Sequence, residues 1–139
     1  MTVTIEGWAR AMLERAGSFG TLATLSVDGT PHQAVVWFLV RGDSIVMNSA
    51  VGRIWPSNLL RDRRCSLLIE HSYDWVSLVG QVQVVAEQAT AQADIAAMAR
   101  RYHSGDPDHA ERMIRDVFER QERISFVLHP ARMAEHHGA

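Results

Sequence analysis

Lysine is missing from this sequence: all 14 of its basic residues are arginines, against 16 acidic residues. The chain therefore has no side chain for Schiff-base chemistry and no lysine general base. The formal net charge is −2 and the isoelectric point is about 6.4, so no overall basic field attracts nucleic acid or an anionic membrane surface. We therefore expect neither nucleic acid nor a membrane as a partner.

Cysteine and long apolar segments are also scarce. The single cysteine, Cys65, excludes an intrachain disulfide and a cysteine-rich metal site, and its place at the start of an apolar run favours a core position. No apolar run approaches the roughly 20 residues that span a bilayer. Charged residues come early in the chain, which is not typical of a secretory signal, so we expect a cytoplasmic protein. They are Glu6, Arg10, Glu14 and Arg15.

Familiar catalytic and metal-binding motifs do not occur. There is no Gly-x-Ser-x-Gly sequence, and the seven histidines are scattered without any i, i+4 pair. We predict no metal centre and assign no catalytic residue. His32 and His71 are titratable groups near predicted strands, but a structural role is the simpler interpretation of each.

Alternating apolar residues predict a mainly β fold with flanking helices (α+β), organised as one domain over residues 1–139. The apolar fraction is 47% and the charged fraction 22%, as in globular proteins. Hairpin signals such as Asp28-Gly29 indicate mostly antiparallel pairing. The six predicted strands are Thr21–Val27, Pro31–Val40, Ser44–Ser49, Cys65–Ile69, Trp75–Ala86 and Ile124–Leu128, and the predicted helices are Ile5–Ala16, a short one after Arg53, Ala91–Tyr102 and Asp108–Arg120.

Three single residues mark expected irregularities. Gly80 inside a long strand predicts a bulge or bend. Thr90 is the expected N-cap of the helix that follows it. Pro130 is expected to end the last strand and leave the tail from Ala131 loosely held.

The sequence Asn48-Ser49-Ala50-Val51-Gly52-Arg53 joins a predicted strand to a predicted helix. Free N–H groups at a helix start favour anions, and glycine lets a ligand approach the backbone closely. Pro56 is compatible with the first helical turn. Arg53 would add a planar cation suited to phosphate. The alternative is an ordinary connection with a solvated arginine.

Three of the four tryptophans are placed where a flat ligand would meet them. Trp37 lies near a strand end, Trp55 follows Arg53, and Trp75 begins the longest predicted strand. Large rings grouped around an arginine-bearing turn suit an aromatic cofactor. Burial in the core is the competing interpretation for each ring.

The segment from Thr21 to Val85 resembles the pyridoxamine 5′-phosphate oxidase-like split β-barrel family, and most closely its branch of deazaflavin (coenzyme F420)-dependent reductases. The resemblance rests on an ordered set of short matches. They are Leu22-Ala23-Thr24-Leu25, Asp28-Gly29, Pro31, Val36-Trp37-Phe38, Gly42-Asp43, Asn48-Ser49, Gly52-Arg53, Asn58-Leu59, Arg61-Asp62, Arg64, Trp75 and Gly80.

This resemblance implies a six-stranded antiparallel split β-barrel that forms a homodimer with two cofactor sites at the interface. The strand ending at Val36 and Trp37 would line the deazaflavin ring, and the strand from Trp75 would approach from the partner subunit. The implied reaction is hydride transfer between coenzyme F420 and a small conjugated substrate. The turn that holds the cofactor's phosphate and side chain would comprise Asn48, Ser49, Arg53 and Asn58, and Trp55 beside Arg53 is a further candidate contact of the cofactor.

The sequence departs from the family pattern next to Arg53. Trp55 stands where a lysine is usual, and Ser57 stands where a second basic residue is common. FMN, which has one phosphate and no acidic tail, is therefore the alternative cofactor. A barrel that binds a cofactor or a tetrapyrrole without turnover is the alternative outside enzymes, and a single-stranded nucleic-acid barrel is disfavoured by the acidic isoelectric point.

Overall fold

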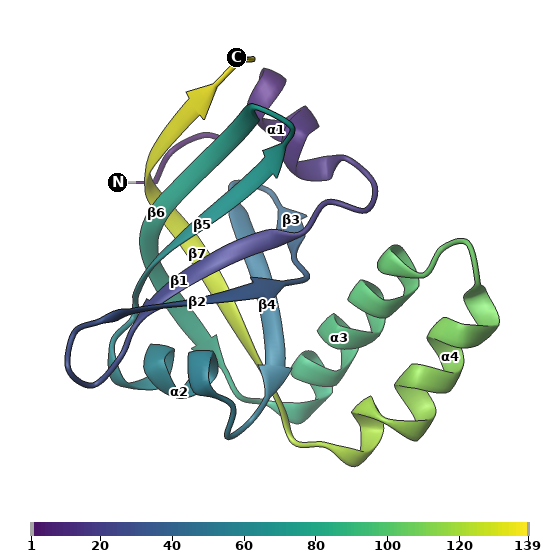
Figure 1. Cartoon of the computed structure of the whole chain (residues 1–139). Helices are drawn as coiled ribbons and strands as arrows, with labels where there is room; N and C mark the ends of the chain where they lie inside the picture. The colour runs from purple at the N-terminus through teal and green to yellow at the C-terminus, as the bar shows by residue number, and fades with distance from the viewer. Residues whose placement is uncertain (1, 139) are drawn as a thin grey trace.

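Seven antiparallel strands form one strongly curled sheet in the computed structural model, which describes residues 2–138 (Figure 1). The strand order across the sheet is β2-β1-β5-β6-β7-β4-β3. The strands are β1 (Gly20–Leu25), β2 (Pro31–Val36), β3 (Leu39–Arg41), β4 (Ser44–Ala50), β5 (Arg64–His71), β6 (Asp74–Val85) and β7 (Arg123–His136).

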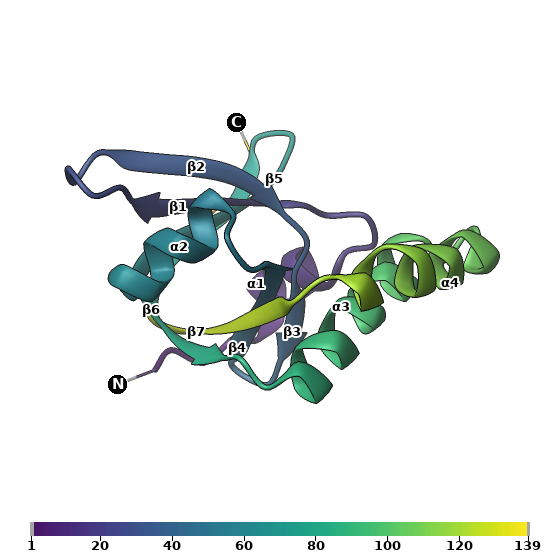
Figure 2. The ribbon, with the colours of Figure 1, turned by 90° about the horizontal axis from the view of Figure 1, so that it is seen from below.

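The connection between β2 and β3 forces the sheet to curl. These two strands occupy opposite edges of the sheet, yet only Trp37 and Phe38 separate them in sequence. The Cα atoms of Val36 and Leu39 are thus at most about 11 Å apart, whereas the edges of a flat seven-stranded sheet lie roughly 29 Å apart. The two edges must therefore approach one another, which gives the split barrel seen end-on in Figure 2.

The mainly β split-barrel prediction is confirmed, with one correction to the strand count. The segment Pro31–Val40 was expected to be one strand, but it is two, because the chain leaves one sheet edge at Val36 and enters the other at Leu39. The uninterrupted apolar run from Ala34 to Val40 hides the crossing. Six predicted strands therefore become seven.

The barrel interior is filled by inward-facing apolar side chains, and helix α1 (Gly7–Glu14) packs against it. Met12 and Leu13 of this helix are buried together with Ile5 just before it. Strand positions alternate between buried and accessible, as one-sided burial requires. Fully buried members of the core include Leu22, Ile45, Met47, Leu67, Leu78 and Phe126.

Strand β7 is much longer than predicted, because Pro130 does not end it. Pairing between β4 and β7 stops at Leu128, and beyond this point the Pro130 carbonyl accepts a hydrogen bond from Val3 N (2.9 Å). The N–H and C=O groups of a strand residue point to the same side, so the missing N–H of Pro130 lies away from β6. Pro130 therefore removes no donor that would point toward β6, and the tail expected to be loose stays paired up to His136.

The predicted irregularity at Gly80 is confirmed. The register between β6 and β7 shifts between Val79 and Gly80, which leaves Ala131 as an extra residue on β7. A Cβ atom on Gly80 would lie 2.4 Å from the carbonyl oxygen of His129. Only glycine allows this close approach of two backbones.

Helices α3 (Gln88–Tyr102) and α4 (Pro107–Asp116) form a hairpin that projects from the barrel opposite the β1–β2 turn (Figures 1 and 2). The hairpin and the 3₁₀ turn η1 (Phe118–Arg120) share a second apolar cluster with the outer side of β4 and β7. That cluster includes Val46, Ile95, Met98, Ile114 and Phe118.

The predicted boundaries of these two helices need correction. Thr90 is not an N-cap: α3 starts at Gln88, and the Thr90 hydroxyl donates to the Glu87 carboxylate within the first turn (3.1 Å). Helix α4 ends at Asp116 rather than continuing to Arg120. Its N-terminus is capped by Asp106, whose carboxylate accepts from His109 N (3.1 Å). None of the helices described is long and apolar enough to cross a membrane.

Candidate functional site

A cavity of about 270 Å³ lies where the end of β2, the end of β4, the start of helix α2 (Ile54–Arg61) and the α3–α4 hairpin meet. Six of the eight residues predicted for the cofactor site line it: Val36, Trp37, Asn48, Ser49, Arg53 and Trp55. Its remaining walls come from Val35, Ile95, Met113, Phe118 and Arg123. Asn58 and Trp75 lie elsewhere.

Arg53 reaches this cavity because of the turn between β4 and α2. Gly52 adopts φ +98°, a conformation that favours glycine, and Arg53 follows in an extended conformation as the N-cap of α2. Ser57 closes the first turn by donating its hydroxyl to the Arg53 carbonyl (2.7 Å). The guanidinium of Arg53 forms no salt bridge within residues 2–138 and remains exposed.

Asn48 and Ser49 are both buried at the end of β4, but their hydrogen bonding differs. The Asn48 amide donates to the Ala91 carbonyl and to Ser125 Oγ, each at 2.9 Å, and its Oδ1 accepts from Arg123. The Ser49 hydroxyl has no hydrogen-bond partner in the described chain, although its residue is only 1% exposed. Asn48 is thus internally satisfied, whereas Ser49, which lines the cavity, has a hydroxyl that no described residue uses.

Arg123 is the functional candidate that sequence reasoning missed. Its residue is 3% exposed, its Nε donates to Asn48 Oδ1 (3.0 Å), and its Nη1 donates to Gln121 (2.6 Å). The guanidinium also lies over the Phe118 ring, 4.9 Å from the ring centroid. Burial first, and the positive charge of Arg53 second, lower the pKa of Arg123 to about 10.

Trp37 forms a flat aromatic wall of the cavity. Its ring stacks on Tyr102 at 5.0 Å with an interplanar angle of 7°, and the edges of His103 and Phe118 flank it. Tyr102 is fixed in turn, because its hydroxyl donates to the Ser18 carbonyl (2.6 Å) and accepts from Phe38 N (3.2 Å). The wall is therefore held rigidly from behind.

The remaining predicted aromatic and polar residues have structural contacts. Trp55 is 8% exposed and packs against Phe126 in the barrel core while it borders the cavity. Asn58 donates to Thr24 Oγ1 (3.0 Å) and thereby ties α2 to β1. Trp75 stacks on His136 (5.5 Å) at the start of β6, away from the cavity.

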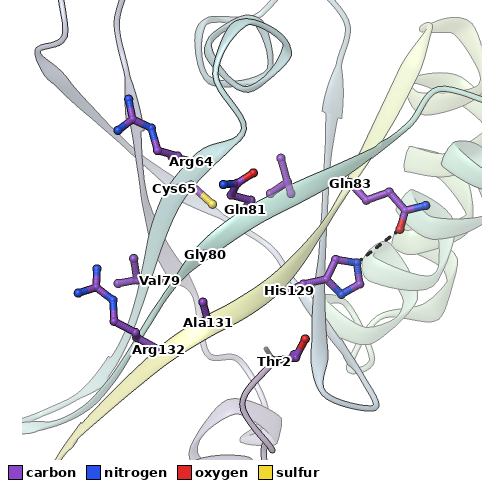
Figure 3. A pocket seen from close by; sticks show the side chains of 11 residues that line it. Thr2, Arg64, Cys65, Val79, Gly80, Gln81, Gln83, His129, Ala131 and Arg132 are labelled. Atoms are coloured by element: carbon purple, nitrogen blue, oxygen red, sulfur yellow. Dashed lines mark hydrogen bonds between the residues drawn. The ribbon is translucent and has the colours of Figure 1, made fainter.

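A larger depression of about 590 Å³ lies on the outer face of β5, β6 and β7 beside the Gly80 bulge (Figure 3). Its polar groups do not converge on one point: only Gln83 and His129 face one another, at 3.4 Å (Figure 3). Burial raises the pKa of the neighbouring Cys65 thiol to about 12, so this thiol is unreactive. Residues 2–138 contain no group of three metal-binding side chains close enough to hold an ion.

The curled antiparallel sheet and the aromatic and cationic cavity at its edges define a split β-barrel protein with a candidate ligand site. A family model described as pyridoxamine 5′-phosphate oxidase matches residues 6–132. The chain belongs to this family.

Three solved structures illustrate the range of proteins that share the fold. A conserved hypothetical protein, Rv2991 from Mycobacterium tuberculosis, is 23% identical, with 95% of this chain and 85% of that one covered and a TM-score of 0.75. An F420 reductase is 20% identical, with coverages of 93% and 97% and a TM-score of 0.71. The heme storage protein HutZ from Vibrio cholerae is 14% identical, with coverages of 95% and 94% and a TM-score of 0.71.

These likenesses show the fold alone, because the identities are low. A search of curated proteins finds no match to this chain.

Proposed function

We propose that the protein is an oxidoreductase that binds coenzyme F420 in the cavity between Trp37 and Arg53 and transfers hydride between this cofactor and a small conjugated substrate. The observation that carries the proposal is the pairing of a rigid, flat aromatic wall with an exposed guanidinium in one cavity. The family supports redox chemistry, and one structural neighbour is named an F420 reductase.

The residues around the cavity fit an anionic, ring-bearing cofactor. Val36 and Trp37 offer apolar and aromatic surface to the ring, and Arg53 offers a fork of donors to the phosphate. The hydroxyl of Ser49, which has no partner among the described residues, is available to the same group. When bound, the deazaflavin supplies the hydride, and the protein orients the ring and excludes water. No protein group is assigned as the proton donor.

We also propose a homodimer, because the cavity of a single chain is small and a partner chain would complete it. Its 270 Å³ falls below the roughly 300–1,000 Å³ typical of cofactor pockets, so a second surface would complete it. Val35, which is 72% exposed, borders both the cavity and the outer sheet face. A partner on that face would therefore sit beside the bound ring, with its own Trp75 strand nearby.

The outer face of the sheet has the composition of an interface. Val35, Thr21, Leu68 and Ser77 are cross-strand neighbours in one row over β2, β1, β5 and β6. The next row contains Gln33, Ala23, Ser66 and Val79 over the same four strands, and Arg132 follows it on β7. An exposed antiparallel face normally carries polar and charged side chains, so two rows without a charge over β2, β1, β5 and β6 favour contact with another protein surface.

Sedimentation of the purified protein tests this arrangement. We expect a dimer for the wild type and a monomer for Leu68→Glu, because the new carboxylate would be buried against a partner. Val27→Glu is the matched control, since Val27 is 84% exposed in the β1–β2 turn. A dimer that survives Leu68→Glu would exclude this face as the interface.

FMN is the second candidate cofactor, and the positions next to Arg53 favour it. Trp55 and Ser57 supply no positive charge, so the cavity offers fewer cations to an acidic cofactor tail than a lysine-bearing site would. FMN has one phosphate and no such tail. The single buried thiol is compatible with a reducing, cytoplasmic location for either activity.

Fluorescence titration with F420 and, separately, with FMN tests the proposed function. We expect Arg53→Ala to weaken cofactor binding about 10- to 100-fold, as the loss of a charge-assisted hydrogen bond predicts. The free energy of unfolding should change by less than about 0.5 kcal/mol, because Arg53 is exposed and unpaired by salt bridges in the described chain. Arg15→Ala, another exposed arginine, is the control.

Equal affinity in wild type and Arg53→Ala would remove Arg53 from the site. Binding of FMN alone would assign the flavin cofactor instead of F420. Binding of neither cofactor would overturn the oxidoreductase proposal and leave a barrel for another ligand. Reduction of an artificial conjugated acceptor by the loaded protein distinguishes an enzyme from a cofactor carrier.

A further inference from the structure

Arg123 is a buried cation without a carboxylate in contact. Buried arginines are normally neutralised by an acidic partner, because removing a charge from water is unfavourable. Within residues 2–138, Arg123 forms no salt bridge. Its hydrogen-bond acceptors are the neutral amides of Asn48 and Gln121. The fold therefore maintains a positive charge at the cavity instead of cancelling it.

A second positive charge lies at the same cavity. Arg53 lines the same cavity, and its charge contributes to the lowered pKa of Arg123. Two guanidinium groups that repel each other destabilise the unliganded protein. An anion between them would relieve the repulsion and restore favourable pairing to both.

A chain of hydrogen bonds links Arg123 to Asp94 without direct contact between the two charges. Arg123 donates to Asn48, Asn48 donates to Ser125, and Ser125 donates to Asp94 (2.7 Å). Asp94 is then paired on its other side with Arg41 (2.7 Å). The chain from Arg123 to Asp94 passes only through the neutral side chains of Asn48 and Ser125, so Asp94 orients the guanidinium but does not neutralise it.

Two of the residues that line the cavity have donors that remain unused. Nη2 of Arg123 makes no hydrogen bond to any other described residue, whereas Nε and Nη1 are occupied. Ser49, which lines the same cavity, has a buried hydroxyl without a partner in the described chain. The unused Nη2 of Arg123 and the unpartnered hydroxyl of Ser49 are observations independent of charge. Both indicate a ligand with several acceptor atoms.

We propose that Arg123 and Arg53 clamp one phosphate group between them, with Ser49 as a further donor, so that the site selects phosphorylated over unphosphorylated ligands. Arg123 supplies from β7 the second cation that is missing at Trp55. The identity of the phosphate's carrier, a flavin-like cofactor, rests on the proposed function, whereas the phosphate clamp itself does not. Arg123 binds the ligand in this scheme and takes no part in hydride transfer.

The test compares ligands that differ only in the phosphate. Affinities for FMN and riboflavin, and for F420 and its phosphate-free deazaflavin core, are measured for wild type, Arg53→Gln, Arg123→Met and Arg123→Lys. We expect the wild type to prefer the phosphorylated ligand at least 100-fold. The preference should fall about tenfold or more in Arg53→Gln, approach one in Arg123→Met and recover partly in Arg123→Lys.

The phosphate preference separates the proposal from a structural role of Arg123. A loosened cavity would weaken both ligands of a pair, whereas loss of the clamp leaves affinity for the phosphate-free ligand within about threefold of the wild type. If Arg123→Met does not fold, Arg53→Gln and Arg123→Lys carry the same comparison. An unchanged preference in the folded variants, or a wild-type preference near one, overturns the proposal.

Failure of the proposed function has a different signature. If no ring cofactor binds to the wild type, calorimetry with inorganic phosphate and with pyrophosphate tests the clamp alone. If either anion binds to the wild type and to Arg15→Ala but not to Arg53→Gln, the clamp is supported. Its natural ligand is then a phosphorylated molecule of another class. Absence of binding to either anion overturns the clamp.

Discussion

The contact between Gly80 and β7 predicts a large destabilisation from the addition of a single methyl group. In Gly80→Ala, the new Cβ atom would lie 2.4 Å from the His129 carbonyl oxygen, 3.0 Å from Pro130 Cα and 3.1 Å from Ala131 N. All three neighbours are backbone atoms, so no side-chain rotation relieves the clash. The bulge itself would have to move.

We expect Gly80→Ala to lower the free energy of unfolding by about 3 kcal/mol, at the upper end of the range for overpacking. For a domain of this size, such a change corresponds to a melting temperature about 10 °C lower. Chemical denaturation followed by tryptophan fluorescence measures it, at several protein concentrations so that any dissociation of a dimer is recognised.

Gly105→Ala is the matched control, because it makes the same chemical change without the contact. No atom lies within 4 Å of its added Cβ, and its φ is not in the left-handed region. We expect this variant to be neutral or stabilised by up to about 1 kcal/mol, since alanine restricts the unfolded chain. A Gly80→Ala variant within about 0.5 kcal/mol of the wild type would refute the steric argument.

Two further predictions follow from the buried groups. Asp94→Asn should lower the free energy of unfolding by about 2 kcal/mol and weaken phosphate binding, because it removes a charge-assisted bond from Ser125; chemical denaturation and the FMN titration check it. Asp116→Asn, at an exposed position, is the control. An equal loss of stability in the two variants would contradict the role of the buried hydrogen-bond chain. The Cys65 thiol, with its pKa raised to about 12, should stay protonated at pH 8. Its alkylation by iodoacetamide should be about 100-fold slower in the native protein than in urea, and equal rates would refute its burial.

Local sequence signals were sufficient for much of the fold and for one side of the cavity. Alternating apolar residues located every strand-forming segment, although β2 and β3 were predicted as one strand, because a sheet with one buried face imposes a period of two. Gly52-Arg53 located the turn that brings Arg53 to the cavity, since φ +98° at Gly52 is a local requirement. Gly80 marked the bulge, because only glycine allows the two backbones to approach closely there.

Errors in the sequence interpretation arose where distant segments decide the local structure. Pro130 continues a strand because Val3 takes the place of β4 on its free side. The segment around Trp37 divides into two strands because the sheet closes there. Thr90 has the right chemistry for an N-cap, but the helix begins earlier, where Gln88 bonds to the backbone of Arg123 (2.7 Å).

The sequence by itself determined the class of fold and the arginine of the β4–α2 turn, because periodicity, turn residues and glycine conformation act over a few neighbouring residues. Only the tertiary structure decided that Arg123 lines the same cavity as Arg53. The pairing of β4 with β7 places Arg123 opposite Ala50 and beside Asn48, which is 75 positions away in sequence. In sequence Arg123 is merely a charged residue before an apolar strand, and its burial without an acid exists only after distant strands have paired.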